Sequence, residues 1–225
     1  MTTVDENRAA HSAETDKVAA DAAAAAANPA LVGVPTFVIG SVALGLYLIG
    51  FTGESTTALV GMIPILFLCT GTGQLIATFW AIRTGAGPVA AIFGIFAGFW
   101  LSFALLVVTL GNDWLGATSS ATDPAQAMVA AGAKETFLLT WVVAVTVLIL
   151  ASLRLPAVFT VLFVLVDAAL LLVLLGTAQE STTLLTAGGI AVFAFTLVGV
   201  YLFFDAMSAA SGGKPLPMGK PLIGS

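Results

Sequence analysis

Charged side chains are scarce in this sequence: Asp, Glu, Lys and Arg together make up 8% of its 225 residues, whereas an average soluble domain carries roughly 25%. So small a share excludes an ordinary soluble globular fold. Hydrophobic residues reach 59% and the mean hydropathy is +1.08, which also excludes a coiled coil and a disordered chain. The composition therefore predicts an integral membrane protein.

Residues that bind metals or form disulfides are almost missing. The single cysteine, Cys69, lies in an apolar run, and the single histidine, His11, lies in a polar N-terminal stretch. Neither a disulfide framework nor a zinc site is expected. Seven Lys and Arg residues stand against twelve Asp and Glu residues, which gives no basic patch that could neutralise several phosphates. We expect no cofactor, no metal and no nucleic-acid partner.

Enzyme motifs are missing as well. The sequence contains no GxSxG nucleophile motif with partners, no HExxH motif and no phosphate-binding GxxxxGK[ST] loop, and no lysine lies inside an apolar run to hold a Schiff-base chromophore. The expectation is a protein that is not an enzyme, with a channel or a carrier as the default.

What is present is a series of long apolar runs, each near the 20 residues that cross about 30 Å of hydrocarbon as a helix. Backbone polar groups cannot stay unpaired in lipid, and these runs lack the alternation of barrel strands, so they must be helices. The sequence predicts an all-α integral membrane protein, a bundle of six transmembrane helices. The expected bounds are Leu31–Phe51, Thr57–Ile82, Pro88–Leu110, Thr136–Leu153, Ala157–Leu175 and Thr183–Phe204, with a long polar loop over Gly111 to Glu135.

Two tails flank the predicted transport domain, residues 28–206. Residues 1–27 are expected to form an acidic tail that is disordered or partly helical, with regulation through the tail as the alternative. Its pattern does not match a signal peptide. Residues 207–225 are the expected C-terminal tail. With six spans, both termini share one side, which also holds six of the seven basic residues and is therefore predicted to be cytoplasmic, the protein lying in the cell membrane: Arg8, Lys17, Arg83, Arg154, Lys214 and Lys220.

The first predicted span begins at a motif with two prolines. Asn28 is a good helix N-cap and Pro29 suits the first helical position. Pro35 follows six residues later, where proline removes a hydrogen bond of the helix. One interpretation is a short half-helix or loop, broken near Gly33 and Pro35, before a helix that starts at about Thr36. Its free N-terminus would attract anions. The other interpretation is a kinked start of a plain helix.

The same motif resembles a known family. The stretch from Asn28 to Phe37 is similar to the Asn-Pro-Ala-Pro-Leu-Gly-Leu signature of the acetate uptake transporter family, the SatP/YaaH type of acetate–succinate permeases. Leu31 stands in place of the second proline of that signature, and Pro35 is additional. Further similarities lie at Gly73-Gln74-Leu75-Ile76-Ala77, Gly98-Phe99-Trp100-Leu101, Tyr201-Leu202 and Leu216-Pro217-Met218-Gly219.

The resemblance implies a protomer with its own substrate pathway, assembled as a homo-hexamer, that moves acetate and in some members succinate. The motif positions imply that Phe37, Phe96 and Val166 narrow the pathway, although ordinary helix packing is the alternative for each phenylalanine. An apolar ring tolerates the methyl group of acetate, whereas its carboxylate needs donors nearby. The candidate donors are Asn28 with the helix start at Pro29, Thr36 and Gln74.

Asp167 is expected near the middle of the fifth span. An isolated carboxylate there is costly, so it should face the bundle interior, carry a proton or be paired. These properties make Asp167 the candidate proton-coupling residue. The alternative is a protonated side chain that holds a neighbouring helix by a hydrogen bond.

Three functional hypotheses follow. The first is a proton-coupled transporter for acetate and related small carboxylates. The second is a passive anion channel of the same fold, which needs no proton site. The third is a membrane scaffold or sensor that transports nothing. Polar residues near the first two spans argue against the third, since a solute path requires them: Asn28, Thr36, Thr70, Thr72 and Gln74.

Overall fold

The computed structural model describes residues 8, 11–17, 28–51, 55–112, 114 and 124–224. Most of these residues are helical, residues 213–221 have no regular secondary structure, and the described part of the chain contains no strand. Among these residues, six helical segments are long and apolar enough to cross a membrane, and the segment Leu59–Arg83 counts as one of them. This confirms the predicted fold class. The helices are α2 (Ala30–Leu48), α3 (Ser55–Pro64), η1 (Ile65–Gly71), α4 (Thr72–Arg83), α5 (Gly87–Gly111), α6 (Pro124–Ser152), α7 (Ala157–Ala178) and α8 (Thr182–Ala210).

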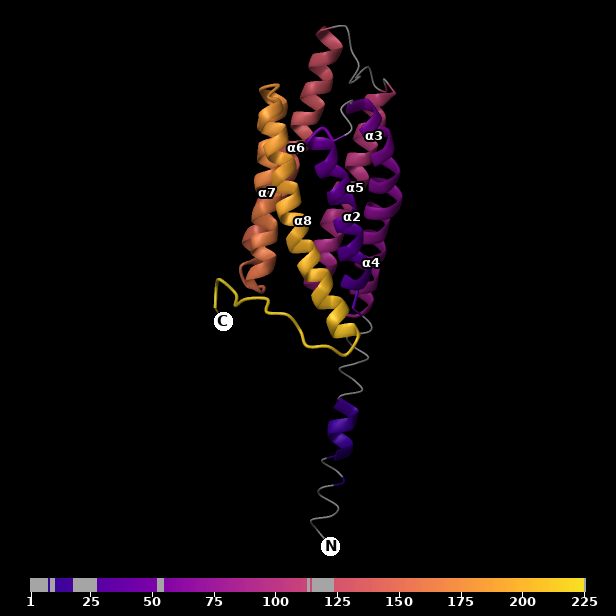
Figure 1. The fold of residues 1–225 in the computed structure, drawn as a ribbon, viewed down its shortest axis with the longest axis vertical. Helices are drawn as coiled ribbons and strands as arrows, with labels where there is room; N and C mark the ends of the chain where they lie inside the picture. The colour runs from indigo at the N-terminus through magenta and orange to yellow at the C-terminus, as the bar shows by residue number, and fades with distance from the viewer. Residues whose placement is uncertain are drawn as a thin grey trace.

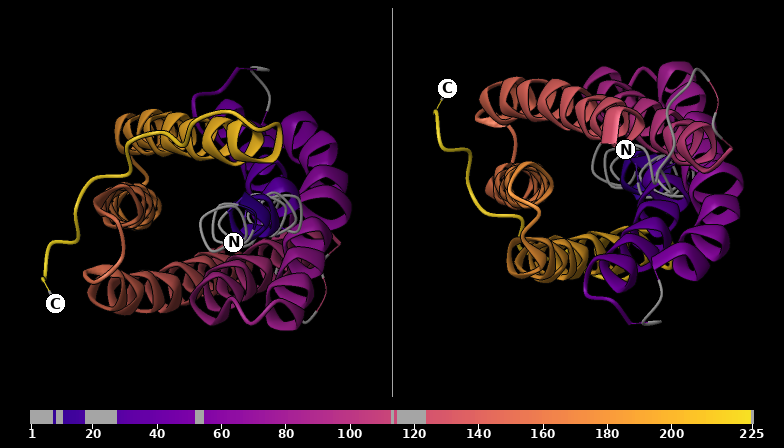
Figure 2. Two further views of the ribbon diagram at one scale, coloured as in Figure 1. Left: turned by 90° about the horizontal axis from the view of Figure 1, so that it is seen from below. Right: turned by 90° about the horizontal axis from the view of Figure 1, so that it is seen from above.

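The spanning helices lie side by side in one bundle (Figure 1). α2 packs against α8, α8 against α7 and α7 against α6, while α4 packs against both α5 and α2. Contacts between α5 and α6 close this series around a central region, as the end-on views show (Figure 2). The start of α2 and the end of α8 lie at the same end of the bundle, as six spans require.

The first span, α2, is a single helix with Pro35 inside it. As predicted, Asn28 caps its start: the side-chain Oδ1 accepts a hydrogen bond of 2.9 Å from the amide of Ala30. The half-helix broken near Gly33 and Pro35 is therefore wrong, and the plain helix is correct. Pro35 is tolerated because it removes only one backbone hydrogen bond near the helix start. Gly33 serves close packing instead, since a Cβ there would overlap the ring of Phe93.

The second span is interrupted where a continuous helix was expected. α3 ends at Pro64, the π-helical segment η1 follows, and α4 completes the span. The wider turn is stabilised by the hydroxyl of Thr72, which donates to the carbonyl of Phe67, five residues earlier, at 2.9 Å. Such segments occur often at functional sites. Here Thr70 and Gln74, on either side of the return to α-helix, are both completely buried.

The fourth span begins earlier than predicted. α6 starts at Pro124 rather than Thr136, so part of the stretch assigned to a loop is helical. Proline suits the first helical position, and the alanine-rich residues after it favour a helix. A helix of 29 residues is about 43 Å long, and its first turns project beyond the other helices at the top of Figure 1. α8 likewise continues to Ala210, past the expected end at Phe204.

The tails that precede and follow the bundle contain a short helix at the N-terminus and an extended segment at the C-terminus. Of the expected N-terminal tail, residues 11–17 are helical, and most of the remainder lies outside the described residues. At the other terminus, residues 214–223 form what we call the C-terminal strap, which crosses the ends of α8 and α7 (Figure 1). The amide of Leu216 donates to Oδ1 of Asp205 at 2.7 Å, and the hydroxyl of Tyr201 donates to the carbonyl of Pro217 at 2.6 Å.

Two glycines bring α2 close to the second span. A Cβ at Gly73 would lie 2.5 Å from Cγ2 of Thr36, and a Cβ at Gly40 would overlap the hydroxyl of Thr70. Gly61 in α3 has open space around it instead. Small residues at such contacts let membrane helices approach closely.

We expect Gly40→Ala to lower the free energy of unfolding by about 1–3 kcal/mol, because overpacking at a tight contact costs that much. Gly61→Ala adds the same methyl group where nothing opposes it, so it should keep or raise stability through the better helix propensity of alanine. Thermal unfolding of the purified variants in detergent measures both effects. Equal melting of Gly40→Ala and Gly61→Ala would show that this contact does not limit stability.

Candidate functional site

Two cavities lie inside the bundle, one toward each end. The larger cavity has a volume of about 600 Å³ and extends to the end that holds Ile49, Lys134 and Glu180. The smaller cavity, of about 220 Å³, extends to the end that holds the termini, where Asn28 and Asp205 line it. Met218 of the C-terminal strap also lines the smaller cavity.

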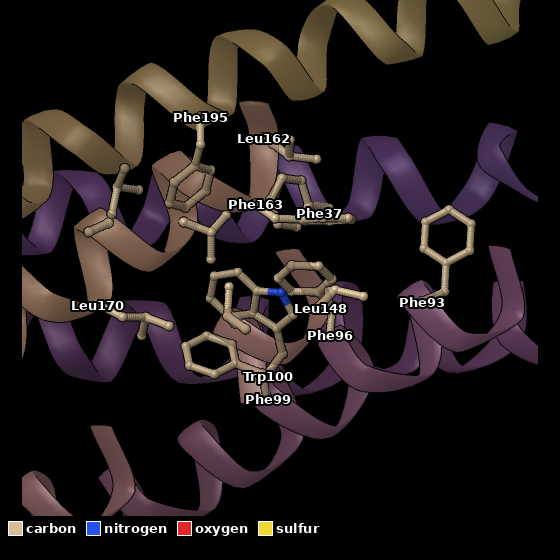
Figure 3. Packing of buried hydrophobic residues seen from close by; sticks show 14 of the residues in the cluster. Phe37, Phe93, Phe96, Phe99, Trp100, Leu148, Leu162, Phe163, Leu170 and Phe195 are labelled. Atoms are coloured by element: carbon tan, nitrogen blue, oxygen red, sulfur yellow. The ribbon is translucent and has the colours of Figure 1, made fainter. Parts of the chain in front are cut away.

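Phe37 of α2 and Phe96 of α5 line both cavities. Their ring centroids are 5.4 Å apart at an interplanar angle of 66°, an edge-to-face contact that favours a fixed arrangement of the rings. Both side chains are almost completely buried, and both point into the interior of the bundle (Figure 3). This pair, which we call the aromatic pair, separates the two cavities. Val166 of α7 lines the larger cavity.

Three further aromatic side chains surround the aromatic pair. Phe195 of α8 lies 5.5 Å from Phe37, and Phe163 of α7 lies 5.9 Å from Phe96, between ring centroids. Trp100 lies 6.4 Å from Phe37. None of these three residues was predicted from the sequence to line the pathway. Phe195 and Phe163 could not be distinguished by any pattern from the other phenylalanines, of which the sequence has fifteen in all. Trp100 follows Phe96 by one helical turn, and this spacing could have identified it.

Gln74 lies at the wall of the smaller cavity. Its side chain is completely buried, and neither Nε2 nor Oε1 has a hydrogen-bond partner among the residues that the structure describes. The hydroxyl of Thr70, one turn earlier, is also buried without a partner. A buried polar group left unpaired costs about 1–3 kcal/mol. The amide of Gln74 is thus available for a ligand that offers both an acceptor and a donor, or for a carboxylate that accepts from Nε2 alone.

The other predicted pathway residues lie elsewhere: Pro29, Thr36 and Asp167 line neither of these two cavities. The hydroxyl of Thr36 donates to the carbonyl of Val32 at 2.9 Å, so this donor is already used. Asp167 lies between α7 and α6, where its Oδ2 accepts a hydrogen bond of 3.2 Å from the hydroxyl of Thr146. The structure therefore brings Asn28, Phe37, Gln74, Phe96 and Val166 to the cavities and leaves the remaining three apart.

Of the residues that the structure describes, Lys134 is the one basic residue that lines either cavity, and Glu180 lines the same end of the larger one. Lys134 was not predicted to be a pathway residue. Among the described residues, no group of three His, Cys, Asp or Glu side chains is placed to hold a metal ion. The cavities are thus apolar in the middle and carry single polar or charged groups toward their ends.

Comparison with known proteins adds both relatives and a solved fold. The model of the GPR1/FUN34/yaaH family matches residues 12–213. Acetate permease A of Emericella nidulans is 28% identical over 155 residues, which is 68% of this chain and 50% of the relative. The meiotically up-regulated gene 86 protein of Schizosaccharomyces pombe is 28% identical over 145 residues, 64% of this chain and 45% of the relative. The chain spans about half the length of these curated relatives.

A solved structure of the bacterial acetate channel SatP superposes on this chain with a TM-score of 0.67. It covers 85% of this chain and 98% of its own, at 18% sequence identity. At that identity the likeness shows a shared fold, and it agrees with the six helices described above.

Proposed function

Because the chain belongs to the GPR1/FUN34/yaaH family, we propose that it is a membrane transport protein, not an enzyme, whose substrates are acetate and related small carboxylates, with succinate as a further substrate. The names of two similar proteins, an acetate permease and an acetate channel, support acetate as the substrate. The observation that carries the proposal is the unpaired amide of Gln74 beside the aromatic pair.

The proposed path runs through both cavities. A carboxylate enters the larger cavity past Lys134, and its methyl group passes the apolar rings of Phe37 and Phe96 at little cost. The carboxylate loses water at this point, which is expensive unless donors replace the water. The amide of Gln74 supplies donors beyond the aromatic pair, and Asn28 lies farther along the smaller cavity.

The test is uptake of labelled acetate into liposomes that contain the purified protein. Acetic acid crosses bilayers unaided, so protein-free liposomes at the same pH give the baseline. We expect acetate uptake above this baseline. Uptake equal to the baseline, by protein that melts cooperatively, would contradict the proposal and reopen the scaffold or sensor hypothesis.

Coupling to protons through Asp167 is the finer part of the proposal. We expect an inward proton gradient to speed the accumulation of acetate above that in protein-free liposomes under the same gradient. Asp167→Asn should lose this increase while leaving flux that equilibrates. Asparagine keeps the size of the side chain and its hydrogen bond to Thr146 but cannot carry the proton. Time courses with and without the gradient measure the difference.

A passive channel is the second candidate, and one observation favours it: Asp167 lines neither cavity. Full gradient-driven accumulation by Asp167→Asn would remove the coupling role from this residue. Wild-type flux above that of protein-free liposomes that the gradient does not increase further would identify a channel.

The proposed assembly is a homo-hexamer in the cell membrane, in contact with the lipid bilayer, with both termini in the cytoplasm. The family resemblance supports the hexamer, and native mass spectrometry of the purified protein tests it. The positive-inside rule supports the orientation, because four basic residues lie at or beyond helix ends on the side of the termini: Arg83, Arg154, Lys214 and Lys220.

A further inference from the structure

Trp100 presents a buried donor to the larger cavity. The residue belongs to α5, one turn after Phe96, and its side chain is 1% exposed. It lines the larger cavity, and within the described part of the chain its indole Nε1 has no hydrogen-bond partner. In Figure 3 the indole nitrogen lies on the side of the ring toward Phe96 rather than Phe99.

No described residue accepts a hydrogen bond from the indole of Trp100. The rings of Phe37 and Phe99 pack against it at centroid distances of 6.4 and 5.0 Å, and Val145 and Val166 line the same cavity. An indole N–H only donates, and a buried tryptophan usually finds a partner. The donor Nε1–H is therefore open to an acceptor supplied by a ligand in the cavity.

Charge alone does not select that acceptor. Lys134 and Glu180 line the same end of the larger cavity, so their opposite charges offset each other there. The donor Nε1–H lies deeper, among apolar rings. A small anion with an apolar end fits both features, because its oxygen accepts from the indole while its methyl group contacts the rings.

We infer that Trp100 forms a second carboxylate-binding site, in the larger cavity and across the aromatic pair from Gln74. This inference rests on the proposed function. On one side of Phe37 and Phe96, a carboxylate oxygen accepts a hydrogen bond from Nε1–H of Trp100. On the other side, it accepts a hydrogen bond from the amide of Gln74. Two sites of this kind divide the loss of hydration into two smaller steps, as sequential sites do in channels.

Trp100→Phe tests the site, because it keeps an aromatic ring and removes the N–H. The expected result is an increase of about tenfold in the acetate concentration that half-saturates flux into liposomes, the size expected for one hydrogen bond to a charged group. The matched control is Trp80→Phe in α4, a half-buried residue that lines neither cavity. It should leave half-saturation unchanged.

The outcomes separate this site from the function itself. Unchanged half-saturation in a folded Trp100→Phe, with normal acetate flux in the wild type, would overturn the second site and leave the proposed function intact. Absent flux in the wild type would overturn the proposed function and the second site together.

A measurement on the wild-type protein covers the case in which Trp100→Phe does not fold. The chain has four tryptophans, so ¹⁵N labelling of the indoles gives four signals, assigned through Phe variants of the other three. Acetate should shift the indole signal of Trp100 and not that of Trp80, whereas sodium chloride at equal ionic strength should shift neither. A Trp100 signal that stays in place while acetate saturates flux would overturn the inference.

Discussion

Phe96→Ala is expected to raise acetate flux several-fold and to admit larger carboxylates such as benzoate. Phe96 and Phe37 are the pair that separates the two cavities. Removing one ring joins the cavities and lets water follow the anion, so the carboxylate loses less hydration on its way. Uptake of labelled acetate and labelled benzoate into liposomes with equal amounts of protein measures both effects.

The control for this variant is Phe79→Ala in α4, where the phenylalanine is 60% exposed and faces away from the bundle. Truncation of a buried phenylalanine costs about 3–5 kcal/mol, so melting must show that Phe96→Ala is folded. Phe96→Leu is the milder second variant. If folded variants of Phe96 conduct acetate at the wild-type rate and still exclude benzoate, the constriction does not lie at the aromatic pair.

The number of membrane spans could be predicted because the length of each apolar run matches the thickness of the bilayer. The cap at Asn28 could be predicted too, since asparagine is a favoured N-cap and proline is favoured at the first helical position. The interruption inside the second apolar run could not be predicted in this way. The π-helical η1 begins directly after Pro64 and contains Thr70, which packs closely on Gly40 of α2. No local pattern reveals such a contact between helices.

Which side of each helix faces the cavities could be predicted only in part. A helix in lipid is apolar on all its faces, so the periodic pattern that marks the inner face of a soluble helix is missing. Phe37, Phe96 and Val166 were placed through the family resemblance, and all three line a cavity. Asp167, the next residue after Val166, turns toward α6 instead. Its position along the membrane was predictable, and its direction was not.

Gln74→Leu is expected to reduce acetate flux by about tenfold or more, because one hydrogen bond to a charged group is worth that much. The same variant should be more stable than the wild type. In the wild type, the buried amide has no partner among the described residues, and such an unpaired group costs about 1–3 kcal/mol. Leucine is of similar size and removes this cost. Liposome uptake and thermal melting in detergent measure the two effects on one preparation.

The opposite signs of these effects distinguish a binding role of Gln74 from a structural one. If Gln74 held helices together, its replacement would lower the stability of the protein. If Gln74 serves to bind the passing anion, its replacement should raise that stability. Thr196→Val is the matched control, since the buried hydroxyl of Thr196 donates to the carbonyl of Val192 at 2.7 Å and lines neither cavity. It should leave flux unchanged and add no stability. A Gln74→Leu protein that melts lower and conducts normally would place the carboxylate-binding donors elsewhere. A protein that melts higher and conducts poorly would indicate that stability is given up at Gln74 for the sake of the substrate.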